Sequence, residues 1–193
     1  MEPDAQAARI YERLMATAKP VRHVHAVPVA PGIYAVLFLG STFPMQCATE
    51  LVKPGTLIYI GKAKQSLDKR VLQEEFRTGK TGQATLRRSL GALLRIELGL
   101  KPIPRSRTEE SASRNRNYKF SVGGETSLTK WMRENLALSY HEYAGGHTGL
   151  KALEEKLISL TIPVLNLKDN PRNPCKAELS AARATCVRLA RKA

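Results

Sequence analysis

The chain has 193 residues, which is enough for one domain with a substantial core. Lysine and arginine number 31 against 17 acidic residues, so the net charge is +14, which favours a polyanionic partner such as nucleic acid. No stretch approaches the ~20 apolar residues that span a membrane, and residues 1–19 lack the apolar centre of a signal peptide. We therefore expect a cytoplasmic protein with no membrane partner.

Three helices, two strands and a loop are predicted over the first two thirds of the chain. Residues 1–30 are expected to form an N-terminal helical extension, because a helical pattern from Asp4 to about Ala18 stops at Pro20. Two apolar runs then predict strands, and Ser66 can cap the helix that follows them. The predicted segments after the extension are strands at 32–39 and 57–61, helices at 66–77 and 86–98, and a long basic loop at 101–119.

The last third of the chain predicts one more strand between helices. A helix at 126–135 precedes a strand at 136–144, and a helix at 149–160 is stopped by Pro163. Residues 171–193 are read as a C-terminal extension with a basic amphipathic helix. The whole pattern predicts a mixed α/β (α+β) domain.

The two first strands carry tyrosines that can share one face. Alternation places Tyr34 opposite Ile33, and Tyr59 opposite both Ile58 and Ile60. Strands favour tyrosine in any case, so the pair alone does not identify a site.

One carboxylate on the helix at 149–160 lies where an apolar residue is expected. At about 100° per residue, Glu154 falls inside the apolar face, whereas Glu155 lies at its edge. A buried carboxylate costs several kcal/mol unless a cation, a donor or a metal compensates it. A structural ion pair with an arginine and a metal site are both open. The other members of the face are Leu150, Leu153, Leu157, Ile158 and Leu160.

Basic residues are expected to contact phosphates. On the helix at 86–98, Arg87, Arg88 and Arg95 fall within one arc opposite the leucines, without the acids that a merely solvated face carries. The full expected nucleic-acid-binding set is Lys64, Lys80, Arg87, Arg88, Arg95, Arg105, Arg107, Arg114 and Arg116.

Two other signals are discounted. Gly79-Lys80-Thr81 lacks the first glycine of a P-loop, and the histidines lack a third metal ligand, so we expect His147 and the others to be surface or packing residues. The cysteines Cys47, Cys175 and Cys186 are odd in number, far apart and without CxxC spacing. This pattern speaks against a disulfide framework and a zinc site, and we expect all three to pack in the interior.

An ordered set of motifs resembles the GIY-YIG nuclease family over about residues 31–170. Gly32-Ile33-Tyr34 and Tyr59-Ile60-Gly61 come first, Lys62 and Arg70 follow, and the run LEEKLISLTIPVLN supplies Glu154, Pro163 and Asn166. The resemblance implies a small, mainly antiparallel three-stranded sheet flanked by helices. Residues 78–135 then form a basic insertion.

The resemblance also implies an activity and a set of site residues. The activity is endonucleolytic hydrolysis of phosphodiesters with Mg²⁺ or Mn²⁺ held by Glu154, with double-stranded or branched DNA as the expected partner and the oligomeric state open. Tyr34 would orient or deprotonate the attacking water with help from Tyr59, and Arg70 would grip the scissile phosphate. Lys62 would add charge, Gly61 would let phosphate approach the strand, and Asn166 would brace the helix and strand ends. The alternative is a catalytically inactive nucleic-acid-binding module of the same fold.

Overall fold

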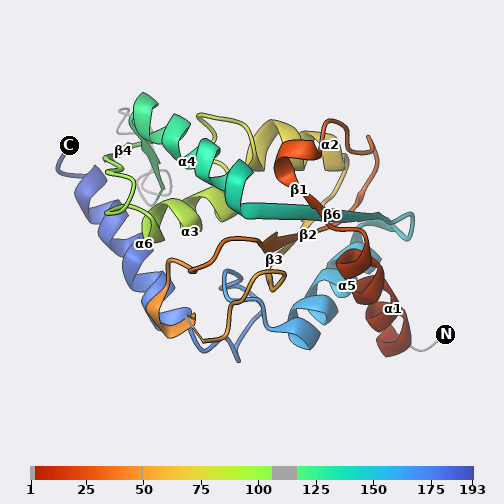
Figure 1. Ribbon diagram of the computed structural model, residues 1–193. Coiled ribbons are helices and arrows are strands. Elements are labelled where there is room, and N and C mark those ends of the chain that lie inside the picture. The colour runs from red at the N-terminus through yellow and green to blue at the C-terminus, as the bar shows by residue number, and fades with distance from the viewer. Residues whose placement is uncertain (1–2, 49, 106–116) are drawn as a thin grey trace.

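The structure is a computed structural model that describes residues 3–48, 50–105 and 117–193 (Figure 1). A four-stranded antiparallel sheet in the order β1-β6-β2-β3 lies at its centre. The elements in chain order are α1 (Pro3–Ala16), β1 (Lys19–Pro20), the 3₁₀ turn η1 (Val21–His23), β2 (Gly32–Phe38), the 3₁₀ turn η2 (Gln46–Ala48), β3 (Leu57–Ala63), α2 (Leu67–Arg70), the π-helical turn η3 (Val71–Glu75), α3 (Thr85–Leu93), β4 (Pro102–Pro104), β5 (Tyr118–Phe120), α4 (Val122–Asn135), β6 (Leu136–Glu142), α5 (Gly146–Thr161) and α6 (Lys176–Ala190).

The sheet is built around β2, which pairs with β3 on one side and β6 on the other. All seven of its residues are buried, because apolar side chains cover both faces. The mixed α/β antiparallel fold is confirmed. The sheet has one more strand than the three expected, because the two-residue β1 pairs Lys19 with Leu138 and Pro20 with Ala137 at the edge of β6.

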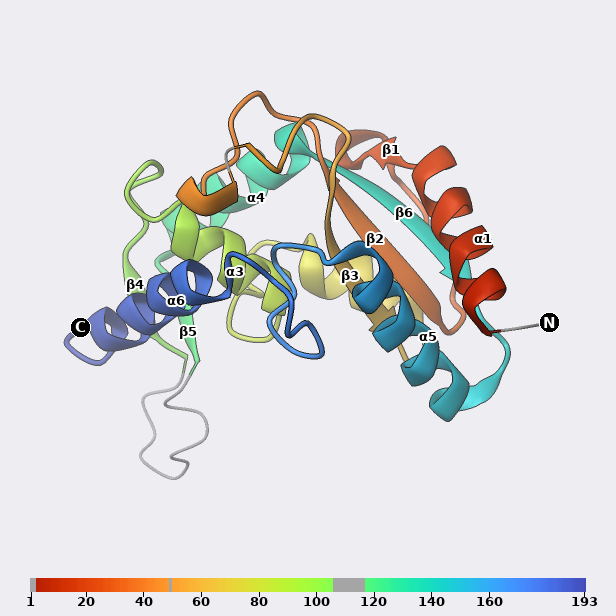
Figure 2. The ribbon, with the colours of Figure 1, turned by 90° about the horizontal axis from the view of Figure 1, so that it is seen from below.

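Helices cover the two faces of the sheet in separate groups (Figure 2). On one face α1 and α5 lie side by side, and Ile10 and Leu157 pack there with Ile33 and Ile60. The larger core on the other face contains Tyr34 and Tyr59 together with residues of α3, α4 and α6. Both tyrosines therefore share a face, as alternation predicts.

The position of Ile58 differs from that prediction. Val36 pairs with Tyr59 but Leu37 pairs with Leu57, so Ile58 is the extra residue of a β-bulge. The bulge turns Ile58 toward the same core as Tyr59, while Ile60 stays on the opposite face.

The predicted loop at 101–119 contains two short strands. The β4 and β5 strands pair antiparallel, with Pro102 opposite Phe120. Phe120 is 2 % exposed because its ring packs against Gly91 of α3, where an added Cβ would lie 2.2 Å from the ring. The segment 78–135 thus contributes its own secondary structure to the larger core.

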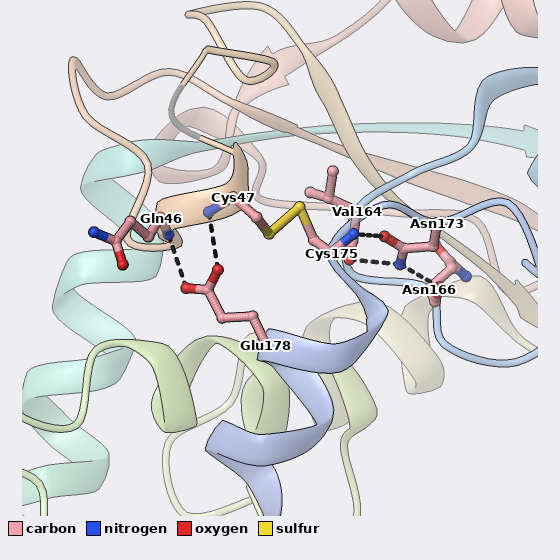
Figure 3. The surroundings of a disulfide bond; sticks show 7 residues. All are labelled: Gln46, Cys47, Val164, Asn166, Asn173, Cys175 and Glu178. Atoms are coloured by element: carbon pink, nitrogen blue, oxygen red, sulfur yellow. Dashed lines mark hydrogen bonds between the residues drawn. A yellow bond between two sulfur atoms is a disulfide. The ribbon is translucent and has the colours of Figure 1, made fainter.

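The expectation that Cys47 and Cys175 are free packing residues is wrong. They form a disulfide between η2 and the start of α6 (Figure 3). The Glu178 carboxylate of α6 also holds η2, since its two oxygens accept from the backbone N–H groups of Gln46 and Cys47, each at 2.8 Å. The pair was missed because a sequence separation of 128 gives no local signal. Cys186 is free and buried, as expected.

None of the described helices is long and apolar enough to cross a membrane.

Candidate active site

A cavity of about 880 Å³ opens at the ends of β2 and β3, beside α2 and α5. It gathers residues that are far apart in the sequence, because β3 leads directly into α2 and α5 packs against β3. Its lining consists of Tyr34, Tyr59, Gly61, Lys62, Ala63, Lys64, Gln65, Ser66, Lys69, Arg70, Glu74, His147 and Glu154. All four residues expected to be catalytic therefore line one pocket.

Glu154 enters the pocket from α5 and is paired with a lysine. Lys62 Nζ donates to Glu154 Oε2, and the two side chains are only 18 % and 14 % exposed. The compensating cation is thus Lys62 and not an arginine. Glu155 lies outside the pocket and pairs with Lys151 on the helix surface at 3.3 Å. Leu160, expected on the apolar face, is 51 % exposed because it follows the end of the packed stretch.

Arg70 projects from α2 between two carboxylates. Ser66 caps this helix as expected, because its Oγ accepts from the Lys69 backbone N–H at 3.1 Å. One guanidinium nitrogen of Arg70 contacts Glu74 Oε2 at 2.8 Å, and another contacts Glu75 Oε1 at 2.7 Å. This double pairing fixes the plane of the guanidinium at the pocket wall.

The sequence analysis missed Glu75, which is fully buried beside the pocket. On an α-helix a residue five positions after Arg70 would point about 140° away from it. The helix instead changes to a π-helical turn, in which the Phe76 N–H bonds to the Val71 carbonyl, five residues back, at 2.9 Å. This wider turn lets both Glu74 and Glu75 reach Arg70. The adjacent glutamates before Phe76 were the available sequence signal.

Tyr34 is hydrogen-bonded to the buried carboxylate. Its hydroxyl donates to Glu75 Oε1 at 3.1 Å, and its ring lies 6.0 Å from the ring of Tyr59. Burial first, and then the Glu75 charge, hold the pKa of Tyr34 well above its usual value. Burial also raises the pKa of Tyr59. Both phenols are thus protonated near neutral pH, and neither is a phenolate at rest.

Glu75 is itself incompletely satisfied. Its Oε1 accepts from both Tyr34 and Arg70, but its Oε2 is buried without a hydrogen-bond partner among the residues that the structure describes. Burial raises the pKa of Glu75, although the Arg70 charge and the Tyr34 hydroxyl oppose the shift. A carboxylate with a raised pKa is a stronger base than an ordinary one, and such groups cluster at catalytic sites.

Gly61 and Asn166 shape the site through packing. An added Cβ at Gly61 would lie 2.4 Å from the Tyr34 hydroxyl, so the glycine leaves room for the Tyr34 ring rather than only for an approaching phosphate. Asn166 replaces a neighbouring strand at Ile60, since its Oδ1 accepts from the Ile60 N–H at 2.9 Å and its Nδ2 donates to the Ile60 carbonyl at 2.8 Å.

The expectation that Arg87, Arg88 and Arg95 contact phosphates is wrong for the first two, because their side chains are buried. Arg87 is 0 % exposed and its Nη2 pairs with Glu125 Oε2 at 2.8 Å, while Arg88 is 9 % exposed and donates to the Thr81 and Gly82 carbonyls. They were misread because protein rather than solvent covers both side chains: α4 covers Arg87, and the turn at residues 81–85 holds Arg88. Arg95 lies beyond the end of α3 and is half-buried.

Of the other residues expected to contact phosphates, Lys64 lines the cavity, whereas Lys80 and Arg105 do not. Lys64 is exposed and lines the cavity. Lys80 is half-buried, and Arg105 is exposed with its side chain next to Gly82, both outside the cavity lining. Arg107, Arg114 and Arg116 lie outside the described residues. His147, expected at the surface or in packing, is exposed at the cavity rim.

Two tyrosines, an arginine and a carboxylate thus meet at the end of a small antiparallel sheet, an arrangement that agrees with the nuclease-type catalytic domain that the family match implies. The family described as the GIY-YIG catalytic domain matches residues 32–185, well over half of the chain. The chain therefore belongs to the GIY-YIG family, and the family prediction is confirmed. No curated protein and no solved structure matches it.

The pocket offers a divalent metal one carboxylate. Among the residues that the structure describes, no three His, Cys, Asp or Glu side chains cluster as ligands. Glu154 nevertheless lies at the cavity with a cationic ammonium against one oxygen, which is the charge that a metal ion would supply. A single carboxylate fits Mg²⁺, which keeps several waters and completes its shell with substrate phosphate. The residues present therefore fit the ion that GIY-YIG nucleases typically use.

Proposed function

We propose that the protein is a divalent-metal-dependent endonuclease that hydrolyses phosphodiester bonds of DNA in this pocket. The observation that carries the proposal is the meeting of Arg70, Tyr34 and Glu154 in one cationic cavity. The Arg70 guanidinium can bind two oxygens of a phosphate, the Tyr34 hydroxyl can bind the attacking water, and the Glu154 carboxylate can bind a metal ion. A net charge of +14 supports a polyanionic substrate.

Arg70 and Lys62 would hold the phosphate that is cut. Arg70 is already oriented by Glu74 and Glu75, so little side-chain entropy is lost when a non-bridging oxygen binds its remaining donors. Lys62 would leave Glu154 and turn to the phosphate when the carboxylate takes up the ion. Mg²⁺ or Mn²⁺ on Glu154 would supply electrostatic stabilisation of the charge that develops on the phosphate and the leaving oxygen.

Tyr34 and Glu75 would move the proton of the attacking water. A phenol with a raised pKa is a poor base by itself, but its proton already points at Glu75 Oε1. As the water oxygen bonds to phosphorus, the water proton passes to the Tyr34 oxygen and the Tyr34 proton passes to Glu75. The bond from phosphorus to the leaving sugar oxygen breaks, and that oxygen takes a proton from solvent.

The alternative, a catalytically inactive binding module, is less favoured. It accounts for the charge, but it leaves no reason to bury Glu75 with one oxygen unpartnered against Tyr34 and Arg70. An inert module would gain stability by replacing that carboxylate.

The test is cleavage of supercoiled plasmid, branched DNA and RNA in Mg²⁺, in Mn²⁺ and in chelator. We expect metal-dependent cutting of DNA by the wild type and no cutting by Glu154→Gln, because the amide cannot hold the ion. Glu155→Gln is the matched control one residue away and should cut normally. A folded Glu154→Gln protein that cuts at the wild-type rate would refute the metal assignment, and a wild type inert on all three substrates would favour the binding module.

A further inference from the structure

A second hollow of about 360 Å³ adjoins the active-site cavity. The two share Tyr59, Lys62 and Glu154 in their linings, so they meet at the point where the metal and the scissile phosphate are expected. The far wall of the second hollow is formed by the turn that precedes α6 and by α6 itself. Its other lining residues are Thr85, Ile158, Leu165, Asn166, Leu167, Lys168, Asp169 and Arg183.

Arg183 provides an uncompensated positive charge in this hollow. It is half-buried on α6 and makes no ion pair with any residue of the described ranges 3–48, 50–105 and 117–193. The other acid of the lining besides Glu154 is Asp169, and it pairs with Lys168 at 3.6 Å. A half-buried arginine without a carboxylate partner is available to bind an anion.

A second arginine increases the positive charge behind the hollow. Burial, and next the Arg183 charge, lower the pKa of Arg88, which means that the two guanidinium groups repel each other. Arg88 donates to Thr85 Oγ1 at 3.1 Å, and Thr85 lines the hollow. The Arg88 Nε is buried and has no hydrogen-bond partner within the described part of the chain. An anion in the hollow would relieve this repulsion.

The part of α6 that carries Arg183 is held firmly. The Cys47–Cys175 disulfide and the two hydrogen bonds to Glu178 fix its first turn (Figure 3), and Leu179, one turn before Arg183, is fully buried. The helix also packs on α3, which bears Arg88. Arg183 is therefore positioned before any ligand arrives, which is what a specific contact requires.

We propose that this hollow binds a phosphodiester of the substrate strand next to the one that is cut, with Arg183 as its main contact and Lys168 as an outer one. The strand would then run from Lys64 and Lys69 across the Glu154 position to Arg183. The planar fork of an arginine suits two oxygens of one phosphate. The inference rests on the proposed function, because it takes the scissile phosphate to lie at Glu154.

The experiment measures duplex DNA binding in chelator, so that no cleavage is needed, as a function of salt. Arg183→Gln should lower the slope of log K against log[salt] by about 0.9, the loss of one phosphate contact. Arg183→Lys should keep the slope, since the charge remains. Arg188→Gln is the control, because Arg188 is exposed on the same helix and lines a different hollow. Thermal melts of all three establish that each is folded.

A second arm locates the contact on the strand. Duplexes that each carry one neutral methylphosphonate linkage are scanned along the sequence. At one position next to the cut, the neutral linkage should weaken the wild type but not Arg183→Gln. An unchanged salt slope in folded Arg183→Gln, or equal losses at every position, would overturn the subsite even if the wild type cuts DNA. A wild type that binds but never cuts, with the slope lowered as expected, would defeat the proposed function while upholding Arg183 as a phosphate contact.

Discussion

Two arginine–glutamate pairs, each with a buried glutamate, differ in how completely the glutamate oxygens are hydrogen-bonded. In the Arg87–Glu125 pair, Glu125 Oε2 accepts from Arg87, Thr81 and the Gly79 N–H, and its Oε1 accepts from the Phe120 N–H. In the Arg70–Glu75 pair, Glu75 Oε1 accepts from Arg70 and Tyr34, and no described residue donates to Oε2.

We propose that the difference separates a structural pair from a reactive one. A carboxylate whose two oxygens are both hydrogen-bonded to several segments holds those segments in place. Glu125 joins the loop at residue 79, α3, α4 and β5 in this way. A buried carboxylate with a free oxygen and a raised pKa, next to a cavity, is able to accept a proton. Under the proposed mechanism, the same two residue types serve the fold in one place and the chemistry in the other.

The largest expected effect comes from breaking the structural pair. Glu125→Ala leaves Arg87 charged and fully buried without its carboxylate partner, and we expect a loss of about 3–5 kcal/mol of unfolding free energy in chemical denaturation. Activity per folded molecule should stay near the wild-type value. Stability within about 1 kcal/mol of the wild type would show that Glu125 does not hold this part of the fold.

A smaller loss is expected when α6 is released. Cys47→Ser removes the disulfide, and we expect about 2–4 kcal/mol less stability under oxidising conditions. A reducing agent should abolish the difference between this variant and the wild type. Cys186→Ser, at the free cysteine, is the control and should show no dependence on the redox conditions.

The smallest effect is a gain of stability when the reactive carboxylate is neutralised. Because burial raises the pKa of Glu75 above its ordinary 4.5, the folded protein binds this proton more tightly than the unfolded chain, so ionisation costs stability as the pH rises through this range. We expect Glu75→Gln to match the wild type near pH 4.5 and to be about 0.5–2 kcal/mol more stable near pH 8. Melts at both values check this, and a loss at pH 8 would contradict it.

Sequence reasoning recovered what local patterns encode. The strands of β2, β3 and β6, the Ser66 cap and the position of Glu154 follow from alternation, capping and helical periodicity. Three features could not be predicted from the sequence because they depend on partners distant in the chain or on irregular backbone. The burial of Arg87 needs Glu125 of α4, the disulfide joins segments 128 residues apart, and Glu75 reaches Arg70 only through the π-helical turn.

The contrast between the two pairs is tested most directly by the pH dependence of single-turnover DNA cleavage, normalised to folded protein, in Glu75→Gln and Glu125→Gln. For the wild type we expect a rate that rises with pH as Glu75 loses its proton. Glu75→Gln should be at least about 10²-fold slower and should lack that rise, because the amide cannot accept the proton. Glu125→Gln should keep the wild-type profile. A Glu75→Gln protein with the wild-type rate and profile would contradict the assignment of Glu75 to the chemistry.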